Sequence, residues 1–279
     1  MKFRQYINAD EFQNDVLEIL LKDEVLNNLP IGILVDGNRE YASDWLMSTV
    51  TDDNDEIKLI AICTKPFNIL LCKPSDSSID NSVEFLAKQL KAINFVPPGI
   101  VAPQELAEGF AKAYCGYNNR LYMIMTLMKL DRLAPYKQSP GFCRMLNEDD
   151  LVYTPNWEHA FCVDCNIPPY TFSQSHERVK SRIGKNIHYI WEDGLPVAQA
   201  VLGRNTPTSA AISWVYTPPE HRGKGYATSV VAELSKNILE SGKNSCCLFA
   251  DSANPASQAV YRKLGYYDVC EFFEIKFDM

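Results

Sequence analysis

The stretch PPEHRGKGYATSVVAEL, Pro218–Leu234, places two glycines, an arginine and a lysine directly in front of an amphipathic run. Within this run Ala227, Val230 and Val231 lie at helical spacing, which predicts a helix with one apolar face. A glycine-rich segment that leads into a helix commonly binds an anion, because free backbone amides and the helix dipole point toward it. The stretch therefore predicts an anion-binding loop, and the next question is which anion it binds.

Two familiar phosphate-binding loops do not fit this stretch. One residue separates Gly223 from Gly225, whereas a P-loop has the longer spacing GxxxxGK followed by Ser or Thr. A dinucleotide-binding loop follows the first strand of its domain and reads GxGxxG, whereas this one reads GKGYA and lies late in the chain. The segment RGKGYA is thus a strand-to-helix loop of another kind.

The residue types of this loop have separate uses in binding an anion. Small residues let a bulky anion approach the backbone, basic side chains supply charge, and the amides of the first helical turn are unpaired donors. We expect the ligand contacts within Arg222, Gly223, Lys224, Gly225, Tyr226, Ala227 and Thr228. Such a set of amides suits a diphosphate better than a single carboxylate. The alternative is an ordinary tight turn with solvated basic side chains.

Length and charge narrow the class of protein. A chain of 279 residues favours two domains, and the segment LAPYKQSPG, Leu133–Gly141, has the two prolines and polar residues of a linker. We place the domains at residues 1–135 and 136–279. The net charge of −8 argues against a nucleic-acid partner. Because the N-terminus lacks an apolar signal segment and no run is long enough to span a membrane, we expect a cytoplasmic protein without membrane contact.

The two halves of the chain show the same run of strand, helix, strand, helix and strand near their ends, which predicts a duplicated architecture. In the first half we expect two strands within 56–73, a helix around 83–90, a short strand within 94–101, a helix from Pro103 and a strand at 120–130 that is buried on both faces. In the second half we expect a strand from Gly141 that leads to an acidic helix start, and a hairpin of 187–192 and 196–202. Further strands are expected at 210–216, 246–250 and 267–277, with one helix after the glycine-rich loop and another from Pro255.

Two blocks of the second half resemble the GNAT superfamily of acyl-CoA-dependent N-acetyltransferases. The family motif Arg/Gln-x-x-Gly-x-Gly/Ala matches Arg222, Gly225 and Ala227, and the family's later block of strand, helix and Tyr-x-x-x-Gly-aromatic matches Ala250–Tyr266. The wider chain resembles a two-domain bacterial branch of the superfamily whose N-terminal half is degenerate. The resemblance implies an α/β (α+β) fold with a mixed, mostly antiparallel twisted sheet flanked by helices, present twice.

The resemblance also implies a donor and a mechanism. In the family the loop amides bind the pyrophosphate of coenzyme A, pantetheine lies between two splayed strands, and an amine attacks the thioester of acetyl-CoA directly. By position, the backbone of Val215, Tyr216 and Thr217 pairs with pantetheine, and an amide near Val215 polarises the thioester carbonyl. Tyr261 corresponds to the general acid that protonates the leaving thiolate; otherwise it is a packing aromatic. Coenzyme contacts are also expected at the start of the helix from Pro255, from Ser257 and from Asn254, which is first of all a helix cap.

The general base is missing at its usual place in the family. Many members carry a glutamate on the strand before the loop, whereas Ala210–Trp214 contains no carboxylate and Ser213 is too weak a base. We consider Asp251, Glu158 and Asp164, each of which can equally be a solvated carboxylate. The departure leaves two hypotheses: an N-acetyltransferase that acts on the primary amine of a small molecule or peptide, and a non-catalytic acyl-CoA-binding sensor.

The remaining sequence features give three further expectations. Nine cysteines scattered through apolar stretches are typical of reduced, buried thiols. The segment His159-Ala-Phe-Cys162-Val-Asp-Cys165 looks like part of a zinc site, but a second ligand pair is missing, so we expect no metal. The first half has no R-x-x-G-x-G/A string; we expect it to bind no second CoA, and instead to close off the acceptor site or to mediate a homodimer.

Overall fold

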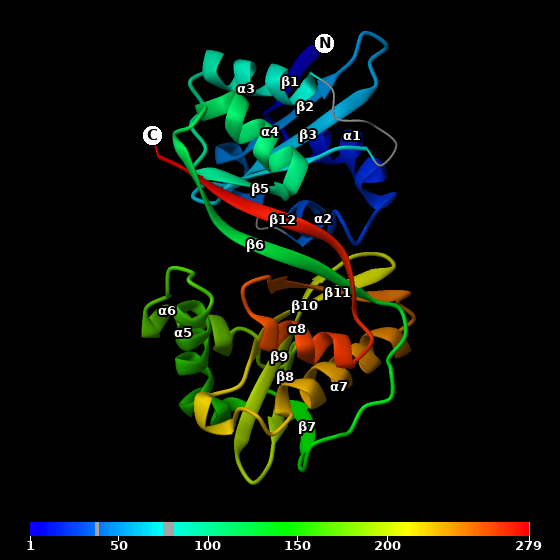
Figure 1. The fold of residues 1–279 in the computed structure, drawn as a ribbon, viewed down its shortest axis with the longest axis vertical. Helices are drawn as coiled ribbons and strands as arrows, with labels where there is room; N and C mark the ends of the chain where they lie inside the picture. Colours follow the sequence, from blue (N-terminus) through cyan, green and yellow to red (C-terminus); the bar gives the residue numbers. More distant parts are fainter. Residues whose placement is uncertain (37–38, 75–80, 279) are drawn as a thin grey trace. The chain divides into compact units, whose positions relative to one another are not determined.

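The computed structural model describes residues 1–36, 39–74 and 81–278 and divides the chain into two compact units (Figure 1). Unit 1 comprises Met1–Leu127 and Val269–Met279, and unit 2 comprises Met128–Asp268. The chain therefore passes between the units twice, through the two long strands β6 (Asn119–Leu130) and β12 (Tyr267–Phe277). The linker at residues 133–141, where the sequence placed the domain boundary, lies inside unit 2 in this division. Within the described residues, no helix is both long and apolar enough to cross a membrane.

Unit 1 is a mixed sheet with helices on both faces. Its other elements are β1 (Lys2–Tyr6), α1 (Ala9–Leu21), α2 (Asn28–Asp36), a 3-10 helix (Arg39–Asp44), β2 (Leu46–Thr51), β3 (Ile57–Cys63), β4 (Ile69–Cys72), α3 (Ser82–Ala92), β5 (Gly99–Pro103) and α4 (Gln104–Cys115). The strand order is β1-β2-β3-β4-β5-β12-β6. The pairs β1–β2, β2–β3, β3–β4 and β5–β12 are antiparallel, and β4–β5 is parallel.

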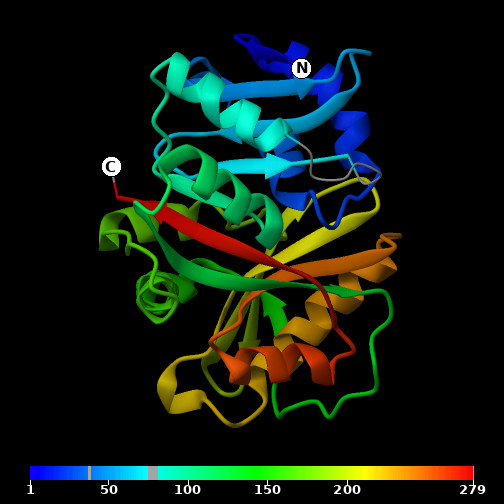
Figure 2. The same ribbon diagram turned by 45° about the horizontal axis from the view of Figure 1, so that its top comes forward.

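The strands of unit 1 are apolar on both sides because both faces of the sheet are covered. Along β3, Leu59 and Ala61 pack with α3 and α4, whereas Ile60 and Ile62 pack with α1 and α2 (Figure 2). This alternation follows from the two-residue period of a strand. Continuous apolar runs such as LIAIC are therefore expected for a sheet enclosed between two helix layers.

Unit 2 repeats the element order of unit 1. Its elements are β7 (Phe142–Met145), a 3-10 helix (Glu148–Val152), α5 (Thr154–Asp164), α6 (Phe172–Lys180), β8 (His188–Glu192), β9 (Pro196–Asn205), β10 (Ser209–Tyr216), a 3-10 turn (Pro219–His221), α7 (Tyr226–Glu240), β11 (Ser245–Asp251) and α8 (Pro255–Lys263). The strand order is β11-β10-β9-β8-β7. All of these pairs are antiparallel except β10–β11, which is parallel. The predicted mixed, mostly antiparallel and duplicated fold is confirmed.

Two strand predictions for the first half differ from the structure. The strand expected within 94–101 lies instead at Gly99–Pro103, because the consecutive prolines 97 and 98 have no amide hydrogen for a ladder. The strand at 120–130 is buried only toward its end: Leu121 is 51% exposed, whereas Leu127 is fully buried. The buried end of β6 includes Met128 and Leu130, which pack in the hydrophobic core of unit 2.

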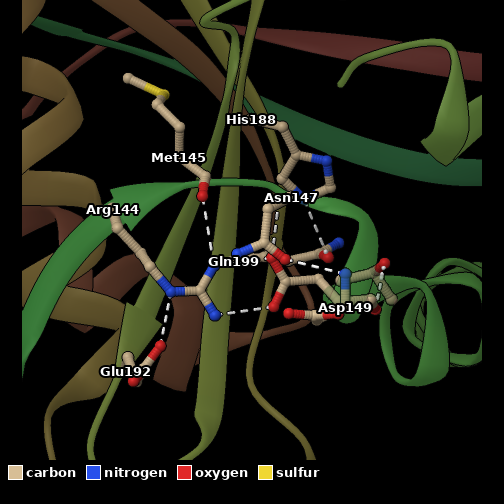
Figure 3. Close-up of polar contacts among 9 residues, drawn as sticks. Arg144, Met145, Asn147, Asp149, His188, Glu192 and Gln199 are labelled. Atoms are coloured by element: carbon tan, nitrogen blue, oxygen red, sulfur yellow. Dashed lines mark hydrogen bonds and ion pairs between the residues drawn. The ribbon is translucent and has the colours of Figure 1, made fainter. Parts of the chain in front are cut away.

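A buried ion-pair network fixes the start of the helical layer in unit 2 (Figure 3). Arg144 of β7 donates to both carboxylate oxygens of Asp150, at 2.6 and 2.8 Å, and to Glu192 of β8. The Asp150 side chain is 1% exposed and also accepts the amide hydrogen of Asn147 at 2.9 Å, in a capping box at the 3-10 helix. The predicted strand and acidic helix start are thus joined by one guanidinium, whose pKa the two carboxylates raise.

We expect Arg144→Met to lower the free energy of unfolding by about 3–5 kcal/mol, because it leaves the charge of Asp150 buried without its partner. The matched control is Arg262→Met, which removes an ion pair with Asp268 whose two side chains are about half exposed and is expected to cost less than about 1 kcal/mol. Urea unfolding followed by circular dichroism measures both values. Equal losses in the two variants would contradict the role of the network.

Candidate functional site

The centre of the sheet in unit 2 opens into a fork. The parallel pairing of β10 with β11 joins Ser209 to Ser245, Ala210 to Cys246 and Ala211 to Cys247 and ends there. We call the two strand segments beyond these pairs, 212–216 and 248–251, the fork. A strand that loses its neighbour exposes backbone amides and carbonyls on that side, so the fork can accept an extended ligand as an added strand.

A bulge in β10 accompanies the fork. The register between β10 and β9 shifts between Ser213 and Tyr216, and Trp214 has a φ of 53°. A left-handed backbone is unusual for a bulky residue and is typical of a bulge that redirects a strand. Val215, the predicted polarising amide, follows this residue directly, so the bulge sets the direction of its N–H group.

A buried glutamine on β9 is hydrogen-bonded to the bulge, and a buried histidine on β8 is hydrogen-bonded to this glutamine. Gln199 of β9 is fully buried and donates its Nε2 hydrogen to the Trp214 carbonyl, 3.3 Å away. Its Oε1 atom lies 3.1 Å from Nε2 of His188 on β8, which therefore carries its proton on Nε2 (Figure 3). Burial, with help from the charge of Arg182, lowers the pKa of His188 to about 3. The imidazole is neutral at physiological pH and serves as a donor to Gln199.

The predicted anion loop, Arg222–Thr228, spans the start of α7, and the residue directly before the helix is the left-handed Gly225. Gly223 and Gly225 have φ values of 79° and 82°. The first intrahelical bond runs from the Ser229 amide to the Gly225 carbonyl, so the amides of 226–228 precede it and have no partner within the helix. The structure thus brings these donors together at one helix N-terminus.

The linker packs against this loop and fixes its path. The Ser139 hydroxyl donates to the Lys224 carbonyl at 2.8 Å, and the Ser139 amide donates to the Ser229 hydroxyl at 2.9 Å. A Cβ atom on Gly225 would lie 2.8 Å from Ser139 Oγ. Glycine is needed at this position both for the backbone angle and for the close approach of the linker.

Three predicted contact residues of the site have side chains that are already engaged. Arg222 donates to Asp164 at 2.6 Å and to the Thr217 carbonyl at 3.0 Å. Tyr226 is buried and donates its hydroxyl hydrogen to Asp193, and Tyr216 is buried beside Trp157. The two tyrosines can therefore meet a ligand only through their backbone. The Thr217 hydroxyl, in contrast, is buried and has no hydrogen-bond partner among the described residues.

Helix α8 carries the predicted acid and a helix cap. Asn254 caps it by accepting the amide hydrogen of Ser257 at 3.0 Å. Tyr261 is 6% exposed, packs edge-on against Tyr266 and has its pKa raised by burial, so it stays protonated at neutral pH. The thiolate form of Cys165, at the end of α5, would raise the pKa of Tyr261 further.

Cys165 interacts electrostatically with two of the base candidates as well as with Tyr261. Burial, followed by the charges of Asp251 and Asp164, raises the pKa of Cys165 to about 11. Groups from α8, α5 and β11 therefore gather at the open end of the fork. Among the described residues, Asp251 forms no ion pair; its Oδ1 accepts the amide hydrogen of Ala253 at 2.8 Å.

The base candidate Glu158 is not a solvated carboxylate. Its side chain is fully buried and pairs with Arg182 at 2.6 Å and with Arg178 at 3.4 Å. Both guanidinium groups also lie over the ring of Trp214, at 5.4 Å for Arg178 and 5.5 Å for Arg182. Neither arginine was among the residues predicted for the site. Their spacing of four residues is the signal that could have placed them on one helical face.

The segment of residues 159–165, which resembles part of a zinc site, lies at the end of α5. His159 is exposed, and its Nδ1 lies 3.1 Å from the Tyr170 carbonyl. Over the described ranges, no group of three or more His, Cys, Asp or Glu is placed to hold a metal ion. All nine cysteines are free thiols, and five of them are buried.

Comparisons with known proteins agree with this geometry. Residues 195–273 match the family model described as FR47-like protein. A GNAT-family acetyltransferase from Colwellia psychrerythraea has 13% identity and a TM-score of 0.63 over 99% of this chain and 100% of its own. The chain has the GNAT fold. A GCN5-related N-acetyltransferase from Sphaerobacter thermophilus, at 15% identity, has a TM-score of 0.61 over 83% of this chain and 80% of its own.

The two units correspond to a tandem arrangement of GNAT folds. A tandem GNAT protein of the clavulanic acid biosynthesis pathway has 14% identity and a TM-score of 0.57 over 98% of this chain and 97% of its own. The resemblance inferred from the glycine loop and from the Tyr261 block is therefore confirmed at the level of the fold. No curated protein sequence gives a match.

The buried histidine of this GNAT fold gives a pH dependence with a definite sign. The folded pKa of His188 is about 3, against about 6.5 for an unfolded chain, so only the unfolded chain binds this proton between these values. The contribution of the neutral His188 side chain to the free energy of unfolding is fully present above pH 6.5. It is lost as the pH falls from 6.5 toward 3, and the free energy of unfolding then decreases by up to about 1.4 kcal/mol per pH unit.

We expect His188→Gln to make the pH dependence between pH 6.5 and 4 shallower, whatever the stability of the variant at pH 7. His159→Gln, at an exposed position, is the control and is expected to keep the slope of the unchanged protein. Urea unfolding at a series of pH values measures the slopes. An unchanged slope in His188→Gln would show that the imidazole is not held neutral.

Proposed function

We propose that unit 2 binds acetyl-CoA in the fork and transfers its acetyl group to the primary amine of a small molecule or peptide. The observation that carries the proposal is the fork itself, which opens directly beside the left-handed glycine loop at the start of α7. A diphosphate at unpaired helix amides and an extended chain in a strand gap are the two parts of one ligand, coenzyme A. The donor is a substrate, and the protein needs no other cofactor for this reaction.

Residues of the fork, of the glycine loop and of the start of α8 suit the coenzyme. The amides of 226–228 face the pyrophosphate, with Lys224 as an exposed positive charge beside them. The backbone of Val215 and Thr217 pairs with pantetheine. The buried Thr217 hydroxyl, which has no partner in the described part of the chain, gains one from the ligand. Asn254 and Ser257 contribute from the start of α8.

The reaction is a direct aminolysis in a ternary complex. The neutral amine attacks the thioester carbon, the new C–N bond forms, and the amide of Val215 stabilises the oxyanion, an effect worth roughly 2.7–4 kcal/mol for one such donor. The C–S bond then breaks, and Tyr261 donates its proton to the leaving thiolate. Asp251, directly or through water, accepts the proton that the amine loses, because the other two candidates are held in ion pairs.

The proposal is tested by measuring CoA-thiol release from acetyl-CoA over a panel of small amines and peptides. Release that depends on a particular acceptor, with an acetylated product seen by mass spectrometry, supports the enzyme. Binding of acetyl-CoA without release above background for any acceptor contradicts it. That outcome favours the second hypothesis, a non-catalytic acyl-CoA sensor, which the missing strand carboxylate motivates.

We expect Tyr261→Phe to lower kcat by roughly 10²-fold or more, because thiolate departure loses its general acid. The dissociation constant of acetyl-CoA should change little. The control Tyr267→Phe removes an exposed hydroxyl bonded to Asp131 and is expected to keep kcat. A Tyr261→Phe enzyme with full kcat would show that this tyrosine only packs.

We expect Gly225→Ala to weaken acetyl-CoA binding, because the left-handed backbone becomes strained and the new methyl group meets the Ser139 hydroxyl. Adding Ser139→Ala should recover part of the affinity. Gly194→Ala is the matched control, since Gly194 also has a left-handed φ, of 75°, but lies in the β8–β9 turn. Isothermal titration measures the three constants. Similar affinity in Gly225→Ala and Gly194→Ala would contradict a role of the loop in binding.

A further inference from the structure

Unit 1 contains a second fork, and a cavity lies in it. The parallel pairing of β4 with β5 joins Ile69 to Ile100 and Leu70 to Val101 and ends there. A cavity of about 180 Å³ opens where the two strands separate, between the start of α2, the start of α4 and β12. Its lining is Leu26, Asn27, Leu29, Pro30, Leu70, Leu71, Cys72, Lys73, Val101, Pro103, Glu105, Leu106, Cys270 and Phe272.

The lining of this cavity is apolar and uncharged over most of its extent. Burial raises the pKa of Cys72 to about 12 and that of Cys270 to about 11, so both thiols are protonated and neutral. The amide of Asn27 donates to the Leu20 carbonyl at 3.0 Å. The charged side chain of Glu105 belongs to an exposed residue. A neutral cavity of this kind provides few hydrogen-bond partners for water.

The size of the cavity fits a definite class of ligand. An engineered apolar protein cavity of about 150 Å³, lined by Leu, Ile and Phe, stays dry and binds benzene or xenon. The cavity of unit 1 is similar in volume and is also lined mainly by apolar side chains. Apolar pockets with few polar groups are the usual form of small-molecule sites.

The segment after β4 argues against a phosphate-bearing ligand here. Where unit 2 has RGKGYA, unit 1 has KPSDSSIDNS at residues 73–82, with two aspartates and no glycine. By its sequence alone, a segment with two aspartates and no glycine does not have the composition of a pyrophosphate-binding loop, which uses positive charge and small residues. Unit 1 therefore has the strand fork without the sequence that would bind the anionic end of a coenzyme.

We propose that unit 1 is a binding module for a small neutral apolar molecule, and that a benzene-sized ring or a short aliphatic chain sits in the β4–β5 fork. The site is separate from the acetyl-CoA fork of unit 2 and does not depend on the function proposed there. Its ligand is held by apolar burial rather than by charge, so its affinity is not weakened by the screening of charges at higher salt concentration.

The test uses the full chain, toluene as the solution probe and xenon as the crystal probe. We expect toluene to raise the melting temperature and xenon to occupy the cavity beside Leu29 and Leu71. Leu29→Phe fills the cavity and should abolish both effects. Ile33→Phe, one turn later on α2 and also partly buried but outside the lining, should retain both.

A second pair of variants keeps the test informative if Leu29→Phe does not fold. Cys270→Leu enlarges a half-buried side chain of the lining, and Cys115→Leu makes the same change at a half-buried cysteine outside it. Loss of the toluene effect in Cys270→Leu alone supports the site. A toluene effect that is absent, or that survives in Leu29→Phe and Cys270→Leu, overturns the proposal. So does binding of two acetyl-CoA molecules per chain with the second lost in Cys270→Leu, because the ligand would then carry phosphate.

Discussion

The separation of β10 from β11 is the constraint on which the rest of unit 2 depends. A central strand normally has its amides and carbonyls paired on both sides, and here the pairing with β11 ends after Ala211. The left-handed residue Trp214 turns the strand away, and this conformation persists because its carbonyl is bonded to the buried amide of Gln199. The cost of the strained backbone is met by packing and hydrogen bonds on the far side of the strand, so the side toward β11 stays open for a ligand.

The two units show that a fork and a glycine-rich loop are separable. Both units have the same element order and a parallel strand pair that ends after two or three residue pairs. The fork is a property of backbone register and can persist through large changes of sequence. The loop depends on particular residues, Gly225 above all, and unit 1 has aspartates and no glycine in the corresponding segment. Duplication of the fold therefore does not imply duplication of the ligand.

The sequence predicted the features that local signals determine. The hairpin around Gly194, the helix after Gly225 and the cap at Asn254 each follow from one or two residues with a strong conformational preference. The contacts that hold the bulge could not be predicted this way. Gln199 and His188 are eleven positions apart on neighbouring strands, and nothing in their local sequence distinguishes them from surface polar residues.

The prediction that Glu158 can be a solvated carboxylate failed for the same reason, because its ion pairs are with Arg178 of α6 and with Arg182 in the turn after α6. The assignment of the last strand was beyond local reasoning too. The apolar pattern of Tyr267–Phe277 fits either sheet, and only the pairing of Ile275 with Ile100 assigns its end to unit 1.

The protonation states of the groups near the fork bear on the reaction proposed for it. Tyr261, Cys165 and His188 are all held in their neutral forms, two by raised pKa values and one by a lowered pKa. Glu158 pairs with Arg182 and Arg178, and Asp164 pairs with Arg222. In the proposed reaction, a fixed N–H dipole in this partly buried region would act on a developing oxyanion more strongly than it would in water. Burial among neutral groups would also favour the uncharged form of the acceptor amine over its ammonium form, and direct attack on a thioester requires the uncharged form.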